Sequence, residues 1–190
     1  TDMTKNIMIV GVGGQGTLLA SRILGNVAIN EGYDVKVSEV HGMSQRGGSV
    51  VTYVKYGDKV YSPIIDEGEA DIILAFEMLE AYRAMPYLKT DGKMIANNQQ
   101  INPMPVITGA AKYPENIELK LEEKINLRTV DALSLATEAG NSKAVNVVLI
   151  GVMAKNTDIP YEDWIESIKT TVPAKFLEVN LKAFDLGYNL

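Results

Sequence analysis

The sequence predicts an α/β fold: a Rossmann-like, mostly parallel sheet flanked by helices, with a β-hairpin insertion and a helical C-terminal third. Residues 5–10 end in an apolar run that stops at Gly11, as in a strand buried on both faces. Residues 17–30 place apolar side chains at helical spacing, and Gly32 is predicted to end this helix. Residues 34–40 then alternate valines with polar residues. Strand, glycine turn, helix and strand form a βαβ unit, for which we expect a right-handed crossover.

The middle of the chain predicts further strands. Residues 49–56 and 59–65 are rich in β-formers and flank Gly57-Asp58, a pair typical of a tight hairpin. Residues 71–76 are a further apolar strand, followed by a helix that Pro86 ends. Asp91-Gly92 is predicted to turn into another strand at 93–98. Residues 99–114, which contain three prolines, predict a surface excursion rather than a domain boundary.

The C-terminal third predicts a short strand at 128–130 and then helices at 132–139, 142–155, 161–170 and 174–187. The helix at 142–155 is apolar nearly all round, which indicates either a core helix or a subunit contact, and we expect core. We therefore expect residues 1–190 to form one domain.

Composition excludes several classes of function. Eighteen Lys and Arg against 24 Asp and Glu give a net charge of −6, so no global positive field exists to attract nucleic acid or anionic lipid. With no cysteine, the chain cannot hold a disulfide, a thiolate zinc site, a cysteine nucleophile or a cysteine-ligated iron-sulfur cluster. No apolar run approaches the ~20 residues that span a bilayer, and no targeting segment is visible. We expect a cytoplasmic protein.

The first glycine-rich turn predicts a ligand site. Gly11, Gly13 and Gly16 satisfy GxGxxG between a strand and a helix, where backbone N–H groups can face a phosphate. Glu39, 23 residues after Gly16, stands where a dinucleotide fold places its ribose-binding acid. The alternatives are that the glycines only permit close packing and that Glu39 is only solvated. Gly14-Gln15 is unusual in such a turn, so Gln15 could contact something other than a pyrophosphate.

A second turn follows the second predicted strand and is more specific. It spans eight residues, in which the single histidine and an arginine stand among glycines. Glycines allow the backbone to donate to an anion, and a guanidinium can bind a phosphate or carboxylate in a bidentate manner. Taken singly, the histidine could be structural and the arginine a surface charge. The candidate binding residues of this turn are His41, Ser44, Gln45, Arg46, Gly47 and Gly48.

Together the segments 11–16 and 39–50 resemble the gamma subunit or domain of 2-oxoacid:ferredoxin oxidoreductases. The segments 61–65 and 144–148, with the closing helix that begins at Pro173-Ala174-Lys175, are similar to the small, beta subunits of the members that oxidise indolepyruvate. The likeness spans nearly the whole chain.

The resemblance implies a non-catalytic subunit, inactive alone, of a cytoplasmic enzyme that converts an arylpyruvate to the aryl-acetyl-CoA and reduces ferredoxin. It implies a larger alpha subunit that carries thiamine diphosphate and iron-sulfur clusters, contact with ferredoxin through the complex, and coenzyme A as co-substrate. This chain lacks a GDG motif followed about thirty residues later by the asparagines of a thiamine diphosphate site. We therefore expect it to supply a Rossmann-like body, an assembly surface and part of the coenzyme A site, with no resident cofactor or metal and no catalytic residue.

Two other functions stay open from the sequence. One is a self-sufficient NAD-dependent Rossmann oxidoreductase, although 190 residues leave little room for a substrate domain. The other is a regulatory nucleotide-binding module.

Overall fold

The six strands of the sheet lie in the order β2-β3-β1-β4-β5-β6. The structure is a computed structural model that describes residues 4–43 and 47–190. Strand β3 is antiparallel to both β1 and β2, whereas β1, β4, β5 and β6 are mutually parallel. The strands are β1 (Lys5–Val12), β2 (Asp34–His41), β3 (Ser49–Gly57), β4 (Ala70–Ala75), β5 (Leu88–Asn97) and β6 (Asn126–Val130).

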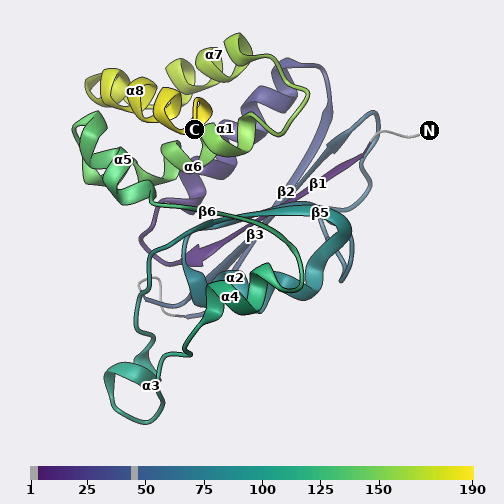
Figure 1. Ribbon diagram of the computed structural model, residues 1–190. Helices are drawn as coiled ribbons and strands as arrows, with labels where there is room; N and C mark the ends of the chain where they lie inside the picture. The colour runs from purple at the N-terminus through teal and green to yellow at the C-terminus, as the bar shows by residue number, and fades with distance from the viewer. Residues whose placement is uncertain (1–3, 44–46) are drawn as a thin grey trace.

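Helices cover both faces of the sheet, and the two layers differ in size (Figure 1). The larger layer contains α1 (Thr17–Asn30), α5 (Ala132–Ala139), α6 (Val145–Ala154), α7 (Tyr161–Thr171) and α8 (Leu177–Tyr188). The smaller layer contains α2 (Met78–Ala84) and α4 (Ile117–Glu122). Short 3₁₀ turns at 85–87, 142–144 and 174–176 adjoin α2, α6 and α8.

Successive side chains of β1 point to opposite faces of the sheet and so pack under different helix layers. Ile7 and Ile9 belong to the hydrophobic cluster under α1, α6 and α8, whereas Met8 and Val10 belong to the cluster under α2 and α4. All four side chains are buried, which explains the continuous apolar run in this strand. The prediction of an α/β fold with a mostly parallel sheet is confirmed.

The predicted hairpin around Gly57-Asp58 is wrong. Residues 59–65 form no strand, and β3 pairs instead with β2 and β1, so that both of its edges are occupied. No edge of β3 is left for a following strand. The same insertion changes the predicted βαβ unit: β2 runs parallel to β1 but lies two positions away, with β3 between them.

The bounds of several other elements differ from the predicted ones. Strand β5 starts at Leu88, so Asp91-Gly92 lies inside it, at a pairing irregularity with β4, rather than in a preceding turn. The helix α4 was not anticipated. The predicted helices at 132–139 and 161–170 are confirmed within one residue, and the other two begin as 3₁₀ turns.

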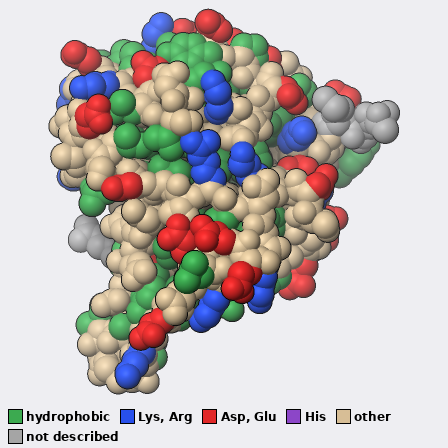
Figure 2. All heavy atoms as spheres, viewed as in Figure 1, with side chains coloured by type: hydrophobic (Ala, Val, Ile, Leu, Met, Phe, Trp, Pro, Cys, Tyr) green, Lys and Arg blue, Asp and Glu red, His purple; other side chains and the backbone are tan. Residues whose placement is uncertain are grey.

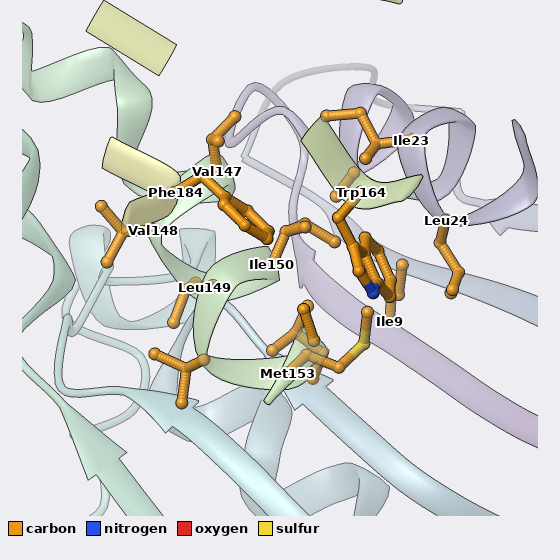
Figure 3. Close-up of a cluster of buried hydrophobic side chains, with 14 of the residues drawn as sticks. Ile9, Ile23, Leu24, Val147, Val148, Leu149, Ile150, Met153, Trp164 and Phe184 are labelled. Carbon is orange, nitrogen blue, oxygen red and sulfur yellow. The ribbon is translucent and has the colours of Figure 1, made fainter. Parts of the chain in front are cut away.

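The apolar helix α6 is a core helix, as expected. Residues 146–154 are all buried within this single chain. Figure 3 shows its side chains beside Trp164 of α7 and Phe184 of α8. Helix α8 approaches α6 closely because a glycine stands at the contact on each helix: a Cβ on Gly187 would lie 2.0 Å from the Val148 carbonyl oxygen, and one on Gly151 2.3 Å from that of Phe184.

The excursion at 99–114 is confirmed. Its one regular element is α3 (Met104–Ile107), a single turn at the tip of a segment that projects from the body (Figure 1). Within the described residues, we find no helix that combines the length and the apolar character needed to cross a membrane.

Alkaline pH is expected to weaken the contact between α7 and α8. The Tyr161 hydroxyl donates to the Asp185 carboxylate, and this hydrogen bond raises the pKa of Tyr161 from 10.0 to about 12. The folded state therefore holds this proton more tightly than the unfolded state, so the stabilisation is complete below pH 10 and is lost as the pH rises through 12. Melting temperatures from pH 9 to 12 should fall more steeply for the wild type than for Tyr161→Phe. Parallel slopes would contradict this assignment.

Candidate functional site

The first glycine turn connects β1 to α1 at the carboxyl edge of the sheet. Gly14 and Gly16 have φ angles of +100° and +83°, a region that L side chains rarely adopt. Gly16 is also the N-cap of α1, and among the described residues no side chain caps this helix end. The first-turn N–H groups of α1 are therefore available to an anionic group.

Two backbone hydrogen bonds join this turn to the second predicted loop. The Gly13 N–H donates to the Gly48 carbonyl over 2.8 Å, and the Gly47 N–H donates to the Gly13 carbonyl over 3.3 Å. The fold thus places the two glycine-rich segments side by side, as a common site requires. Gly13 consequently has no free N–H for a phosphate. Ser44, Gln45 and Arg46 lie outside the described residues.

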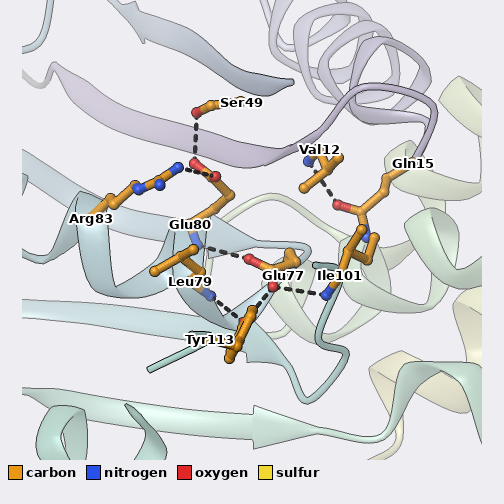
Figure 4. Close-up of polar contacts among 9 residues, drawn as sticks. All are labelled: Val12, Gln15, Ser49, Glu77, Leu79, Glu80, Arg83, Ile101 and Tyr113. Carbon is orange, nitrogen blue, oxygen red and sulfur yellow. Dashed lines mark hydrogen bonds and ion pairs between the residues drawn. The ribbon is translucent and has the colours of Figure 1, made fainter. Parts of the chain in front are cut away.

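The Gln15 side chain turns into the protein. Its Oε1 accepts from the Val12 N–H over 2.8 Å (Figure 4), and its Nε2 donates to the Phe76 carbonyl over 3.0 Å. The Asn97 amide donates to the same Phe76 carbonyl and accepts from the Ala132 N–H. Gln15 and Asn97 therefore tie together the ends of β1, β4 and β5 and the start of α5, which is a structural role.

Replacing Gln15 with alanine should destabilise the isolated chain. The change leaves the Val12 N–H and the Phe76 carbonyl without this partner, and an unsatisfied buried group costs about 1–3 kcal/mol. We expect a loss of about 1.5 kcal/mol in the free energy of unfolding, measured by urea denaturation. An unchanged unfolding midpoint would show that the inward contacts contribute nothing.

Glu39 and His41 face the glycine turn across a hollow of about 420 Å³ that Gly14 and Leu18 also line. Both side chains are exposed. Glu39 Oε2 accepts from the Thr52 hydroxyl over 3.4 Å, and His41 Nδ1 lies 2.9 Å from the carbonyl oxygen of Gly42. Since neighbouring strands lie about 4.8 Å apart, the inserted β3 sets Glu39 one strand further from β1 than in a dinucleotide-binding unit.

A larger hollow of about 710 Å³ opens on the other side of the glycine turn, toward α5 and α6. Lys143 borders this hollow together with Gln15, Gln99 and Leu133. Lys143 was missed from the sequence because it is an ordinary polar position between two helices. Only the fold makes Lys143 line the same hollow as the glycine turn, where its positive charge can attract an anion.

Two buried carboxylates, which were also not predicted from the sequence, hold the segments beside this site through hydrogen bonds (Figure 4). Glu77 caps α2 through the Glu80 N–H at 2.9 Å and also accepts from the Ile101 N–H at 3.0 Å and from the Tyr113 hydroxyl. Burial and this bond to Glu77 raise the pKa of Tyr113. Glu80 accepts from the Ser49 hydroxyl over 2.6 Å and from Arg83 over 2.8 Å.

Glu77 carries no clear signal in the sequence, because glutamate is not among the residues favoured at helix N-caps, which are Ser, Thr, Asp, Asn and Gly. Chemically, the site as described offers glycine backbone, an uncapped helix start, one lysine and one carboxylate. In the described part of the chain no three potential ligands among His, Asp and Glu gather as a metal centre would need. The arrangement suits binding of an anionic ligand.

Comparison with known proteins gives a consistent result. Residues 6–190 match the family model described as pyruvate ferredoxin/flavodoxin oxidoreductase. The indolepyruvate oxidoreductase subunit IorB of Pyrococcus horikoshii is 49% identical over 188 residues, covering 96% of this chain and 93% of that protein. The same subunit of Methanothermobacter thermautotrophicus is 39% identical, covering 98% and 97%.

Solved structures show the same fold. The gamma subunit of a keto/oxoacid ferredoxin oxidoreductase from Geobacter sulfurreducens superposes with a TM-score of 0.73 at 24% identity, covering 97% of this chain and 96% of that one. The 2-oxoglutarate:ferredoxin oxidoreductase of Magnetococcus marinus, solved with 2-oxoglutarate, coenzyme A and succinyl-CoA bound, gives 0.74 at 16% identity, covering 98% of this chain and 30% of that one.

Proposed function

The chain belongs to the pyruvate ferredoxin/flavodoxin oxidoreductase family, and we propose that it is the non-catalytic small subunit of a 2-oxoacid:ferredoxin oxidoreductase that acts on arylpyruvates such as indolepyruvate. The observation that carries this proposal is the likeness, over nearly the full length of both chains, to subunits named for indolepyruvate oxidoreductase. Chains named for pyruvate and ketoisovalerate oxidoreductases are similar at lower identity, 28% in Thermococcus kodakarensis, which favours the arylpyruvate substrate.

The chemistry of decarboxylation and electron transfer belongs, in this proposal, to a larger alpha subunit with thiamine diphosphate and iron-sulfur clusters. This chain has no thiolate to ligate a cluster. The proposal gives the small subunit the tasks of assembly and of binding part of coenzyme A, with reduced ferredoxin leaving through the complex. It places the protein in the cytoplasm.

The glycine turn is the proposed contact for the phosphates of coenzyme A. Gly16, the N-cap of α1 that no described side chain caps, and Lys143 both line one open hollow there. Helix N-termini and basic side chains are the groups that bind phosphate. An NAD-dependent oxidoreductase is not favoured, because Glu39 lies one strand too far from the turn and the Gly13 N–H is already bonded.

Reconstitution tests the proposal. The chain alone should not oxidise any 2-oxo acid, and the complex with its large subunit should reduce ferredoxin with indolepyruvate or phenylpyruvate in preference to pyruvate or 2-oxoisovalerate, provided coenzyme A is present. Turnover by the isolated chain would contradict the non-catalytic role. A preference for pyruvate would contradict the substrate.

Arg46 is expected to act in the complex rather than in folding. Arg46→Ala should change the unfolding free energy of the isolated chain by no more than about 0.5 kcal/mol, as for a surface substitution. In the complex it should weaken coenzyme A use or subunit affinity by about 1.5–3 kcal/mol, which is typical of a lost charge-assisted hydrogen bond. A large stability loss with wild-type kinetics would make Arg46 structural.

A further inference from the structure

The segment 101–114, called the arm below, projects from the body of the molecule (Figures 1 and 2). None of its fourteen residues is buried. One of the fourteen, Lys112, is charged, although charged residues make up 22% of the chain. Met104 and Ile107 at its tip are each 66% exposed. Depletion of charge together with exposed Met and Ile is the composition of an interface core and not of ordinary solvent-facing surface.

The arm is held in place although it has no core of its own. Buried Glu77 accepts from the Ile101 N–H at one foot of the arm and from the Tyr113 hydroxyl at the other, while Tyr113 itself accepts from the Leu79 N–H at 3.0 Å (Figure 4). Inside the arm, the Ala111 N–H donates to the Pro105 carbonyl over 2.9 Å. One carboxylate thus fixes both ends of an exposed projection that carries a single charged residue, Lys112.

We propose that the arm is a pre-positioned anchor by which this chain docks on the large subunit of its oxidoreductase, with Met104 and Ile107 entering an apolar recess of that subunit and Glu77 acting as the positioning residue. The inference rests on the proposed function. It adds the surface through which assembly occurs.

Three observations favour the large subunit as the occupant. In the Magnetococcus marinus protein this fold makes up 30% of one chain, so there it is joined to a much larger remainder. The arm borders a hollow of about 220 Å³ with Gly47, Gly48 and Ser49, so a partner gripping the arm would also reach the candidate site. A second copy of this chain is disfavoured, since two molecules of net charge −6 repel each other.

A matched pair of variants tests the anchor. Ile107 in the arm and Ile29 at the end of α1 are the same residue type, 66% and 57% exposed. Both Ile107→Ser and Ile29→Ser should leave the melting temperature of the full-length chain unchanged. Titrated with the purified large subunit, Ile107→Ser should raise the Kd at least tenfold, chiefly through faster dissociation, and Ile29→Ser should bind as the wild type.

Tyr113→Phe tests the positioning. It removes the hydroxyl that joins the arm to Glu77 and keeps the ring. We expect faster hydrogen exchange in residues 101–114 and at the Leu79 N–H, which loses its acceptor. We also expect slower association with the large subunit, because the arm must then be ordered on binding. Unchanged exchange and association would overturn the role of Glu77.

The other outcomes are also decisive. Equal Kd values for Ile107→Ser and wild type would overturn the docking inference and leave the proposed function standing. Failure of the wild-type chain to bind any large subunit would overturn the proposed function and this inference with it. Self-association lost in Ile107→Ser, with complex formation unaffected, would assign the arm to a second copy and overturn the inference.

Discussion

Replacing Gly187 with alanine is expected to lower the free energy of unfolding by at least about 3 kcal/mol, at the upper end of what overpacking costs. The added methyl group would lie 2.0 Å from the Val148 carbonyl oxygen and 2.9 Å from its carbon. These are backbone atoms of α6, so no rotamer change can relieve the clash, and α8 has to move away from the helix it packs on. Urea unfolding of the isolated chain, followed by circular dichroism, measures the loss.

Gly25→Ala is the matched control. Gly25 also lies inside a helix and is buried, but the nearest atom to its added methyl group would be Val37 Cγ2 at 3.9 Å, an ordinary contact. This change should be neutral or stabilise by up to about 1 kcal/mol, since alanine loses less backbone entropy in a helix than glycine. If both variants lost similar stability, a general intolerance of the core to added volume, rather than the α6–α8 contact, would be the cause.

The sequence predicted the layers of the fold better than the order of the strands. The apolar composition of Ile7–Val10 and of the helix around Val148 is enough to predict that both are buried, and both were placed correctly. The pairing of β3 was not predictable in the same way, because its alternating pattern is compatible with any neighbouring strand. Residues 59–65 have no edge of β3 to pair with, because β3 lies between β2 and β1 in the sheet.

The candidate site was predictable where backbone freedom was the signal. Gly14 and Gly16 have positive φ angles, and Gly47 and Gly48 pair with Gly13. Side chains that act through tertiary contact, such as Lys143 and Glu77, were not visible from local pattern. Gln15 shows the converse. An amide within a glycine turn suggests a ligand contact, and yet its partners are backbone groups of β1 and of the segment after β4, together with the Gln99 side chain.

The two interpretations of the glycine turn, close packing and ligand binding, are separable at Gly16. A Cβ there would lie 2.5 Å from Asn146 Nδ2, which donates to the Gly16 carbonyl over 3.2 Å. Gly16→Ala is therefore expected to lower the free energy of unfolding by about 2–3 kcal/mol, of which about 1–2 kcal/mol is the left-handed backbone conformation. Gly14→Ala should show the backbone part alone, since no heavy atom lies within 4 Å of the added methyl group.

A double-mutant cycle with Asn146→Ala isolates the packing part. Removing the Asn146 amide makes room for the methyl group, so Gly16→Ala should cost less in that background, and the coupling should reach about 1 kcal/mol. Additive losses would mean that Asn146 does not confine Gly16. These free energies are measured without any ligand. The proposed binding of coenzyme A at the turn is tested separately, as any further stabilisation that coenzyme A gives to the wild-type complex. If Gly14→Ala removes this stabilisation and Gly25→Ala retains it, the open side of the turn, at Gly14, binds the ligand. The closed side, where Gly16 faces Asn146, then serves packing.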